Sequence, residues 1–97
     1  MKNQYCICIL IVLLGCQRNH IDIIYVKSIE WQYENGYKVG MGDFMDFTNE
    51  NTGFKIVNDT IYFLNEPNAI ILSVKKRSRE LIVRSFDGRK GKYISMH

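Results

Sequence analysis

The side chains that could supply a nucleophile or its base are three cysteines, five serines and two histidines. A serine or cysteine nucleophile needs a base within hydrogen-bond reach. The histidines are His20 and the last residue, His97, and neither stands in a recognisable serine-hydrolase motif. The sequence therefore predicts no catalytic residue, and we expect a protein that is not an enzyme.

The three cysteines all lie close to the N-terminus, at Cys6, Cys8 and Cys16. Lys2 gives this region a positive start, residues 5–14 form an apolar run, Gly15 is small, and polar residues begin at Gln17. This order is typical of a secretory signal peptide. The apolar run is too short for a permanent membrane-spanning helix, which needs about 20 residues. We expect residues 1–15 to be a signal helix that is removed.

The end of the leader, Leu13-Leu14-Gly15-Cys16, resembles the lipobox of bacterial lipoproteins. The resemblance implies that the Cys16 thiol receives a diacylglyceryl group and that the chain is cut between Gly15 and Cys16. It also implies acylation of the new N-terminus, so that two or more acyl chains give stable anchoring. Residues 16–20 would then form a lipidated tether, and the membrane would be the first partner of the protein.

The residue after the cysteine is Gln17 rather than aspartate. By the sorting rule of this family, that residue favours the outer membrane of the cell envelope over the inner membrane. Two alternatives stay open, namely an ordinary signal peptide cut elsewhere and an uncleaved anchor.

Charge is divided unevenly along the mature chain. Residues 17–66 hold four basic and eight acidic side chains, whereas residues 67–97 hold eight basic and two acidic ones. The basic residues are Lys75, Lys76, Arg77, Arg79, Arg84, Arg89, Lys90 and Lys92. They predict a surface for an anionic lipid, a glycan or an acidic protein. The export signal argues against nucleic acid, and internal charge complementarity is the alternative reading.

Carboxylates and amides gather in one segment that could attract calcium. Its members are Asp43, Asp46, Asn49, Glu50 and Asn51. Their spacing does not match an EF-hand loop, and no cluster of histidine and cysteine suggests zinc. We therefore predict no metal and no cofactor, and interpret this segment as a solvated acidic loop.

The elements that must position these groups are strands. Ile21–Val26 is predicted as a strand buried on both faces, and residues 29–33 alternate as a half-buried strand with Trp31 on the inner face. Asn35-Gly36 predicts a two-residue hairpin turn, with Tyr37–Val39 starting the return strand. Further turns are expected at residues 58–59, 65–68, 75–79 and 87–91. No segment after Cys16 has a helical period with caps.

Short strands joined by local turns predict one all-β domain over residues 21–97, an antiparallel meander that closes into a small barrel or sandwich. The last 40 residues or so weakly resemble the closing hairpins of lipocalin-like domains in bacterial lipoproteins, through residues 58–62, 81–83 and 87–93. The chain is short for eight full strands. The aromatic side chains would line a pocket or, more commonly, fill the core. They are Tyr25, Trp31, Tyr33, Tyr37, Phe44, Phe47, Tyr62, Phe63 and Tyr93.

These observations favour a non-enzymatic envelope lipoprotein that acts as an accessory or binding module. The alternative, which follows from the lipocalin resemblance, is a carrier of a small apolar ligand. An internal cavity lined by the aromatic side chains would favour the carrier. A filled core would favour binding at the surface.

Overall fold

The computed structural model describes residues 21–96. The predicted signal helix, the cleavage site at Gly15 and Cys16, and the tether up to His20 lie outside the described residues. Within them, the secondary-structure elements in chain order are α2 (Ile23–Lys27), β1 (Glu30–Gly36), β2 (Phe44–Asp46), η1 (Glu50–Thr52), β3 (Phe54–Val57), β4 (Thr60–Phe63), β5 (Glu66–Lys75), β6 (Glu80–Ser85) and β7 (Lys90–Ser95).

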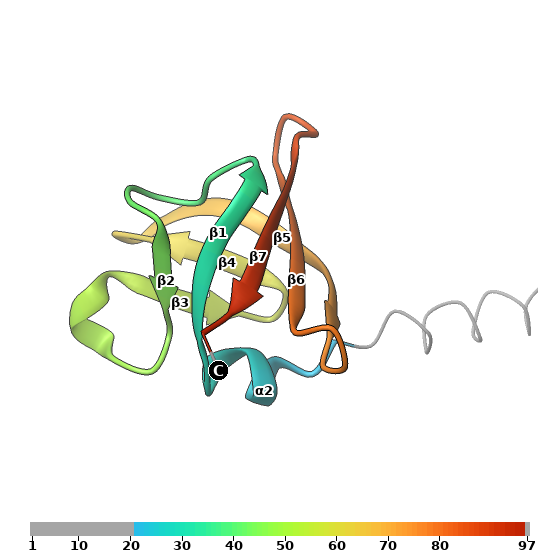
Figure 1. The fold of residues 1–97 in the computed structure, drawn as a ribbon. Coiled ribbons are helices and arrows are strands. Elements are labelled where there is room, and N and C mark those ends of the chain that lie inside the picture. Colours follow the sequence, from blue (N-terminus) through green and yellow to red (C-terminus); the bar gives the residue numbers. More distant parts are fainter. Residues whose placement is uncertain (1–20, 97) are drawn as a thin grey trace, which may run out of the picture.

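The described strands form one antiparallel sheet in the order β2-β1-β7-β6-β5-β4-β3. Most neighbours follow each other in sequence, but β1 pairs with β7, so the first and last strands lie side by side (Figure 1). The sheet curls into a nearly closed barrel whose two edges are β2 and β3. The predicted all-β, barrel-like meander is therefore confirmed.

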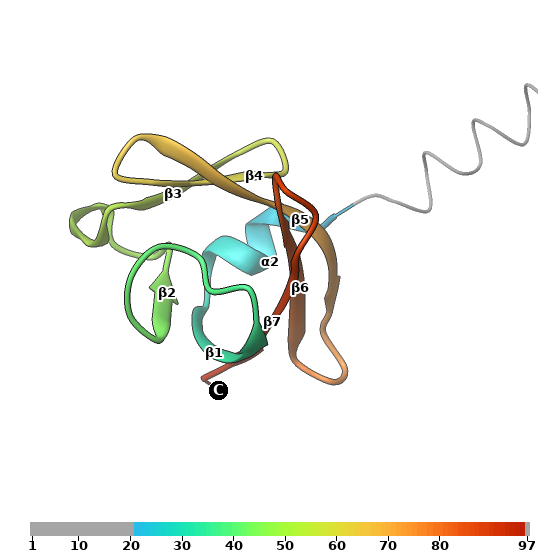
Figure 2. The same ribbon diagram turned by 90° about the horizontal axis from the view of Figure 1, so that it is seen from above.

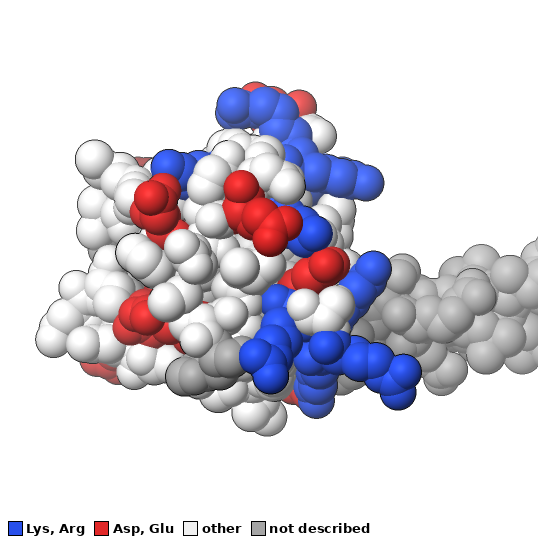
Figure 3. Space-filling view, viewed as in Figure 1, with Lys and Arg blue, Asp and Glu red and all other residues white. Residues whose placement is uncertain are grey.

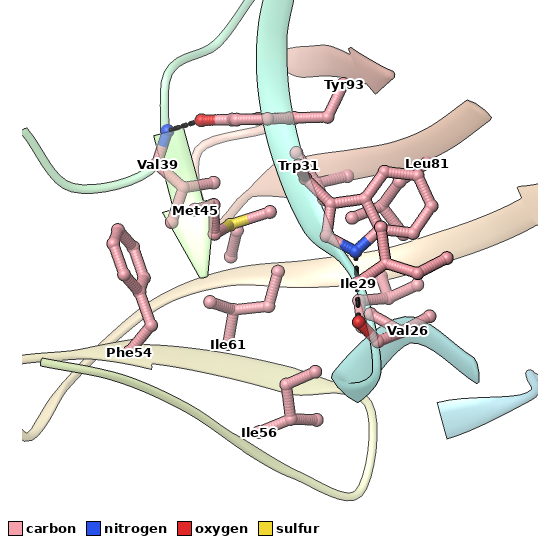
Figure 4. Close-up of a cluster of buried hydrophobic side chains, with 13 residues drawn as sticks. Val26, Ile29, Trp31, Val39, Met45, Phe54, Ile56, Ile61, Leu81 and Tyr93 are labelled. Atoms are coloured by element: carbon pink, nitrogen blue, oxygen red, sulfur yellow. Dashed lines mark hydrogen bonds between the residues drawn. The ribbon is translucent and has the colours of Figure 1, made fainter. Parts of the chain in front are cut away.

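The barrel interior is occupied by side chains from every strand (Figure 4). Trp31, Met45, Ile61, Leu81 and Tyr93 are fully buried, and they come from β1, β2, β4, β6 and β7. Burying side chains of this size contributes about 1.5–3 kcal/mol each. The aromatic residues predicted for either a core or a pocket belong mainly to this core or pack against it.

Polar atoms within the core are paired. The indole N–H of Trp31 donates to the carbonyl oxygen of Val26 at 3.0 Å, and the Tyr93 hydroxyl accepts from the Val39 N–H at 2.7 Å (Figure 4). An unpaired polar group at such depth would cost about 1–3 kcal/mol. These bonds attach α2 and the segment after β1 to the sheet.

The prediction of a strand at Ile21–Val26 is wrong, because residues 23–27 form the helix α2. The Asp22 carboxylate accepts from the Tyr25 N–H at 3.0 Å and so caps the helix. Val26 faces the core and is fully buried, whereas Ile24 points outward and is 83% exposed. A short apolar run fits a strand and a helix equally well. Figure 2 shows α2 inside the ring of strands, where it covers one end of the barrel.

The predicted hairpin at Asn35-Gly36 is also wrong. β1 ends there, but the chain makes an excursion over residues 37–43 before β2 pairs back. Gly36 has a φ of +81°, and a Cβ atom there would lie 2.2 Å from the Lys90 carbonyl oxygen. Gly36 therefore allows β7 to approach β1 closely, and it does not form a two-residue turn.

Two other connections agree more closely with expectation. Asn58-Asp59 is a two-residue turn between β3 and β4, as predicted. The next turn falls at Leu64-Asn65, where both residues have positive φ, so β5 already begins at Glu66 and includes Pro67. The expected connection at residues 65–68 is thus displaced toward the N-terminus.

Candidate functional site

The predicted basic residues do not form one strip. Lys75, Lys76, Arg77 and Arg79 lie at the turn between β5 and β6, whereas Arg89 and Lys90 lie at the turn between β6 and β7. Consecutive turns of a meander lie at opposite ends of the strand that they share, so β6 separates the two groups. In Figure 3 the blue side chains accordingly gather at two ends of the molecule.

The larger group, together with Lys27, is referred to here as the basic end: Lys27, Lys75, Lys76, Arg77 and Arg79. All five side chains are exposed. Lys76 joins the β5–β6 turn to α2, because its Nζ lies 2.6 Å from the Asp22 carboxylate and 5.1 Å from the centre of the Tyr25 ring. Lys27 occupies the last turn of the same helix. The helix and the turn thus combine their cations at one end of the barrel.

The described chain begins at this same end. Ile21 and the capping residue Asp22 precede α2, and Figure 1 shows this start of the described chain close to the β5–β6 turn. The exposed apolar side chain of Ile24 lies on the same helix. The place where the chain enters the domain, the basic side chains and an exposed aliphatic group therefore lie together.

The remaining predicted cations have different surroundings. Lys92 is held between Glu34, at 3.0 Å, and Glu80, at 3.3 Å. Hydrogen bonds to these two carboxylates raise its pKa above the ordinary lysine value. Lys92 is thus neutralised within the sheet, as the charge-complementarity alternative expects, whereas Arg84 and Lys90 are exposed.

A second site lies at the opposite end of the barrel, and the sequence reasoning missed it. It is an open pocket of about 300 Å³ lined by Tyr37, Pro67, Asn68, Ser85, Phe86, Asp87 and Arg89. These residues come from the excursion after β1, the start of β5 and the turn between β6 and β7. Only the closure of the sheet brings them together, although the sequence had predicted a turn at residues 87–91.

Hydrogen bonds fix the polar side chains of this pocket. The Arg89 Nε–H donates to Asp87 at 3.0 Å, and the Ser85 hydroxyl donates to the same carboxylate. These bonds, with that from Ser85 the stronger influence, lower the pKa of Asp87. The Arg89 guanidinium lies 4.9 Å from the centre of the Tyr37 ring, and the Tyr37 hydroxyl donates to the Asn68 side chain at 3.0 Å.

The segment considered for calcium uses its oxygens internally. Asp43 pairs with Lys38 at 2.7 Å, the Asp46 carboxylate accepts from the N–H and hydroxyl of Thr48, and the Asn49 side chain caps η1. Over residues 21–96, no group of three or more histidine, cysteine, aspartate or glutamate side chains is placed to hold a metal ion. None of the helices in that range is long and apolar enough to span a membrane.

Comparison of the chain with protein-family models, with curated proteins and with solved structures finds no match. Inferences about function therefore depend on the amino-acid sequence of residues 1–16 and on the two ends of the barrel.

Proposed function

We propose that the protein is a lipid-anchored, non-enzymatic binding module of the bacterial cell envelope, with its basic end against anionic lipid head groups. The observation that carries this proposal is the coincidence, at one end of the barrel, of the chain entry at Ile21 and the basic end. The anchoring cysteine, Cys16, precedes that entry by five residues.

The length of the tether supports this arrangement. Five residues of fully extended chain span at most about 18 Å, so a lipid on Cys16 keeps Ile21 near the membrane surface. Each Lys or Arg close to an anionic surface contributes about 1 kcal/mol of attraction. The basic end then supplies an electrostatic contact in addition to the acyl chains, and the exposed Ile24 supplies an apolar one.

The filled interior supports binding at the surface over the alternative of an apolar-ligand carrier. Trp31 and Tyr93, which a carrier would need to turn toward a ligand, are fully buried and pack edge to face against Tyr25 and Tyr33. The proposal assigns no reaction to the domain. Ser85, which has a carboxylate partner, is only 3% exposed, and its hydroxyl both donates to Asp87 and accepts from the Arg89 N–H.

Mass spectrometry of the protein purified from its native membranes tests the anchor. We expect an N-terminal peptide that begins at Cys16 and carries the mass of a diacylglyceryl group. The Cys16→Ser variant should keep residues 1–15 and lack the lipid mass. A native protein with an intact leader and no acyl mass on Cys16 would refute the proposed anchoring.

Hydrogen–deuterium exchange of the lipidated protein in vesicles tests the basic end. Amides of residues 76–79 should be more protected in vesicles containing phosphatidylglycerol than in phosphatidylcholine alone, and salt should remove the difference. The triple variant K27Q/K75Q/R77Q should lose this protection. The matched control K55Q/R84Q/K90Q removes the same number of exposed cations elsewhere and should keep it. Equal exchange in both lipids would contradict the proposed contact while leaving the anchor intact.

A further inference from the structure

The geometry points to a binding site for a neutral saccharide in the pocket formed by Tyr37, Asn68, Phe86, Asp87 and Arg89. This inference goes beyond the proposed membrane attachment and does not depend on it. The pocket lies at the end of the barrel opposite α2, and Figure 2 looks onto that end. A ligand could therefore reach it while the basic end rests on a membrane.

The pocket is preorganised by its backbone as well as by its side chains. The Tyr37 N–H donates to the Lys90 carbonyl at 2.8 Å, which fixes the segment after β1 against the start of β7. A Cβ atom at Gly91 would lie only 2.0 Å from the Tyr37 carbonyl oxygen, which shows how closely the two segments approach. Binding groups that are already held in place lose little conformational freedom when a ligand arrives.

Asn68 lines the pocket, and its side-chain amide is held in place by hydrogen bonds. Its Oδ1 atom already accepts from the Tyr37 hydroxyl at 3.0 Å and from the Gly40 N–H at 3.1 Å. These two bonds fix the orientation of the amide. Within the described part of the chain, the Nδ2 group has no hydrogen-bond partner, so both of its N–H donors remain for a ligand.

Asp87 and Arg89 add an acceptor and further donors. Both the Ser85 hydroxyl and the Arg89 Nε–H use the Oδ1 atom of Asp87. The side chains of Asp87 and Arg89 are 62% and 65% exposed, so both are accessible to a ligand. A sugar hydroxyl both donates and accepts, so adjacent hydroxyls could donate to Asp87 and accept from Arg89 or Asn68.

Aromatic side chains complete the site. Phe86 lines the pocket and is 57% exposed, so its ring is accessible to a ligand. The flat apolar face of a pyranose ring is a suitable partner for it. Arg89 lies over the Tyr37 ring, so the planar guanidinium and the two rings together form a partly apolar lining.

The charge of the lining selects a neutral ligand. Asp87 and Arg89 carry opposite charges and are paired with each other, and the other lining residues are uncharged. An anion such as a phosphate would be repelled by the Asp87 carboxylate, and a cation would be repelled by the Arg89 guanidinium. A polyhydroxyl ligand without net charge is repelled by neither group.

Saturation-transfer difference NMR tests this inference. The lipidated protein is purified in a detergent without a sugar head group, and the neutral probes are glucose, N-acetylglucosamine and chitobiose. The anionic probes are glucuronate and glucose 6-phosphate. We expect saturable transfer from at least one neutral probe with a Kd in the millimolar range, because the pocket is open and shallow. The anionic probes should bind at least about tenfold more weakly.

Three variants make the result specific to the pocket. Phe86→Ala should weaken binding about tenfold, the usual effect of removing one stacking ring. Asn68→Asp keeps the acceptor used by Tyr37 and Gly40 but replaces the donors, and it should weaken binding to a similar degree. Phe44→Ala removes an aromatic ring of similar exposure, 49%, on β2 outside the pocket and should leave binding unchanged.

The following outcomes would overturn the inference. They are no transfer from any neutral probe, equal or tighter binding of an anionic probe, and the same loss in Phe44→Ala as in Phe86→Ala. The circular dichroism spectrum of each variant verifies that its fold is intact, so that loss of binding can be assigned to the pocket.

Discussion

The hydroxyl of Tyr93 accepts a hydrogen bond from the backbone N–H of Val39, at a distance of 2.7 Å and across 54 positions of the sequence. Both residues are buried, at 0% and 1% exposure. The bond attaches the irregular segment after β1 to the last strand of the sheet. It therefore holds one wall of the pocket around Asp87 and Arg89, because Tyr37 belongs to that segment.

Replacing Tyr93 with phenylalanine should reduce the free energy of unfolding by about 1–3 kcal/mol, because the Val39 N–H would remain buried without an acceptor. Urea unfolding followed by fluorescence or circular dichroism measures the change. Tyr33→Phe is the control, since its hydroxyl bonds to the Gly36 carbonyl in an exposed position. Equal losses of unfolding free energy in the two variants would show that the buried hydrogen bond contributes no more to stability than the exposed one.

Stability should also fall at alkaline pH through Tyr93. Burial is the main cause that raises the pKa of its hydroxyl to about 12 from an ordinary value of 10.0. The folded state keeps the proton after the unfolded state has begun to lose it. The contribution of the protonated Tyr93 hydroxyl to the free energy of unfolding is therefore fully present below pH 10. It is lost between pH 10 and pH 12, at about 1.4 kcal/mol per pH unit.

The difference in unfolding free energy between the native protein and Tyr93→Phe, measured across this pH range, isolates the contribution of Tyr93 from that of the other tyrosines and the lysines. The difference should decrease as the pH rises from 10 to 12. A difference that stays constant over this range would show that the folded-state pKa is not raised.

Gly91→Ala should destabilise the protein by at least about 3 kcal/mol. A Cβ atom at this position would lie 2.0 Å from the Tyr37 carbonyl oxygen, and backbone cannot move aside as a flexible side chain can. Gly42→Ala is the control, since Gly42 has a φ of +89° but no neighbouring atom near the added Cβ. That variant should lose only about 1–2 kcal/mol through backbone strain. Thermal or urea unfolding of both variants tests the order.

Leu64→Asn should leave the fold unchanged and stabilise it by up to about 1 kcal/mol. Leu64 occupies the turn between β4 and β5 with a φ of +52°, a conformation that asparagine adopts more readily. Its side chain is 62% exposed, so little buried apolar surface is lost. A lower midpoint of urea unfolding would indicate instead that Leu64 contributes more through its contact with Gly53 than it costs in backbone strain.

Local patterns in the sequence were sufficient for much of the sheet. The alternation over residues 29–33 predicted that Ile29, Trp31 and Tyr33 share the inner face; Ile29 and Trp31 are buried, and Tyr33 is partly buried against the core. Asn58-Asp59 and the charged tip after β5 were placed correctly, because turn residues act through their own backbone preferences. These features depend on neighbours in sequence, so they can be read without the fold.

The helix at residues 23–27 was missed because a short apolar run fits a strand and a helix equally well, whereas the other missed features depend on partners far away in sequence. Ile21–Val26 has the composition of a strand, but Asp22 caps a helix there and Trp31 bonds to its Val26 carbonyl. Gly36 predicted a hairpin, yet its role is set by Lys90. The pocket around Asp87 and Arg89 was missed for the same reason, since residues 37, 67–68, 85–87 and 89 meet only when the sheet closes.

The pairing of β1 with β7 has a consequence for the order in which the molecule can assemble. A chain that emerges N-terminus first presents β1 early and β7 last. Until β7 has been synthesised, Trp31 and the edge of β6 that pairs with β7 therefore remain exposed to solvent. Binding of the emerging chain by a chaperone would therefore matter most just before residues 90–95 are synthesised. A pulse of protease at that stage should cut this partly folded intermediate but not the fully folded domain.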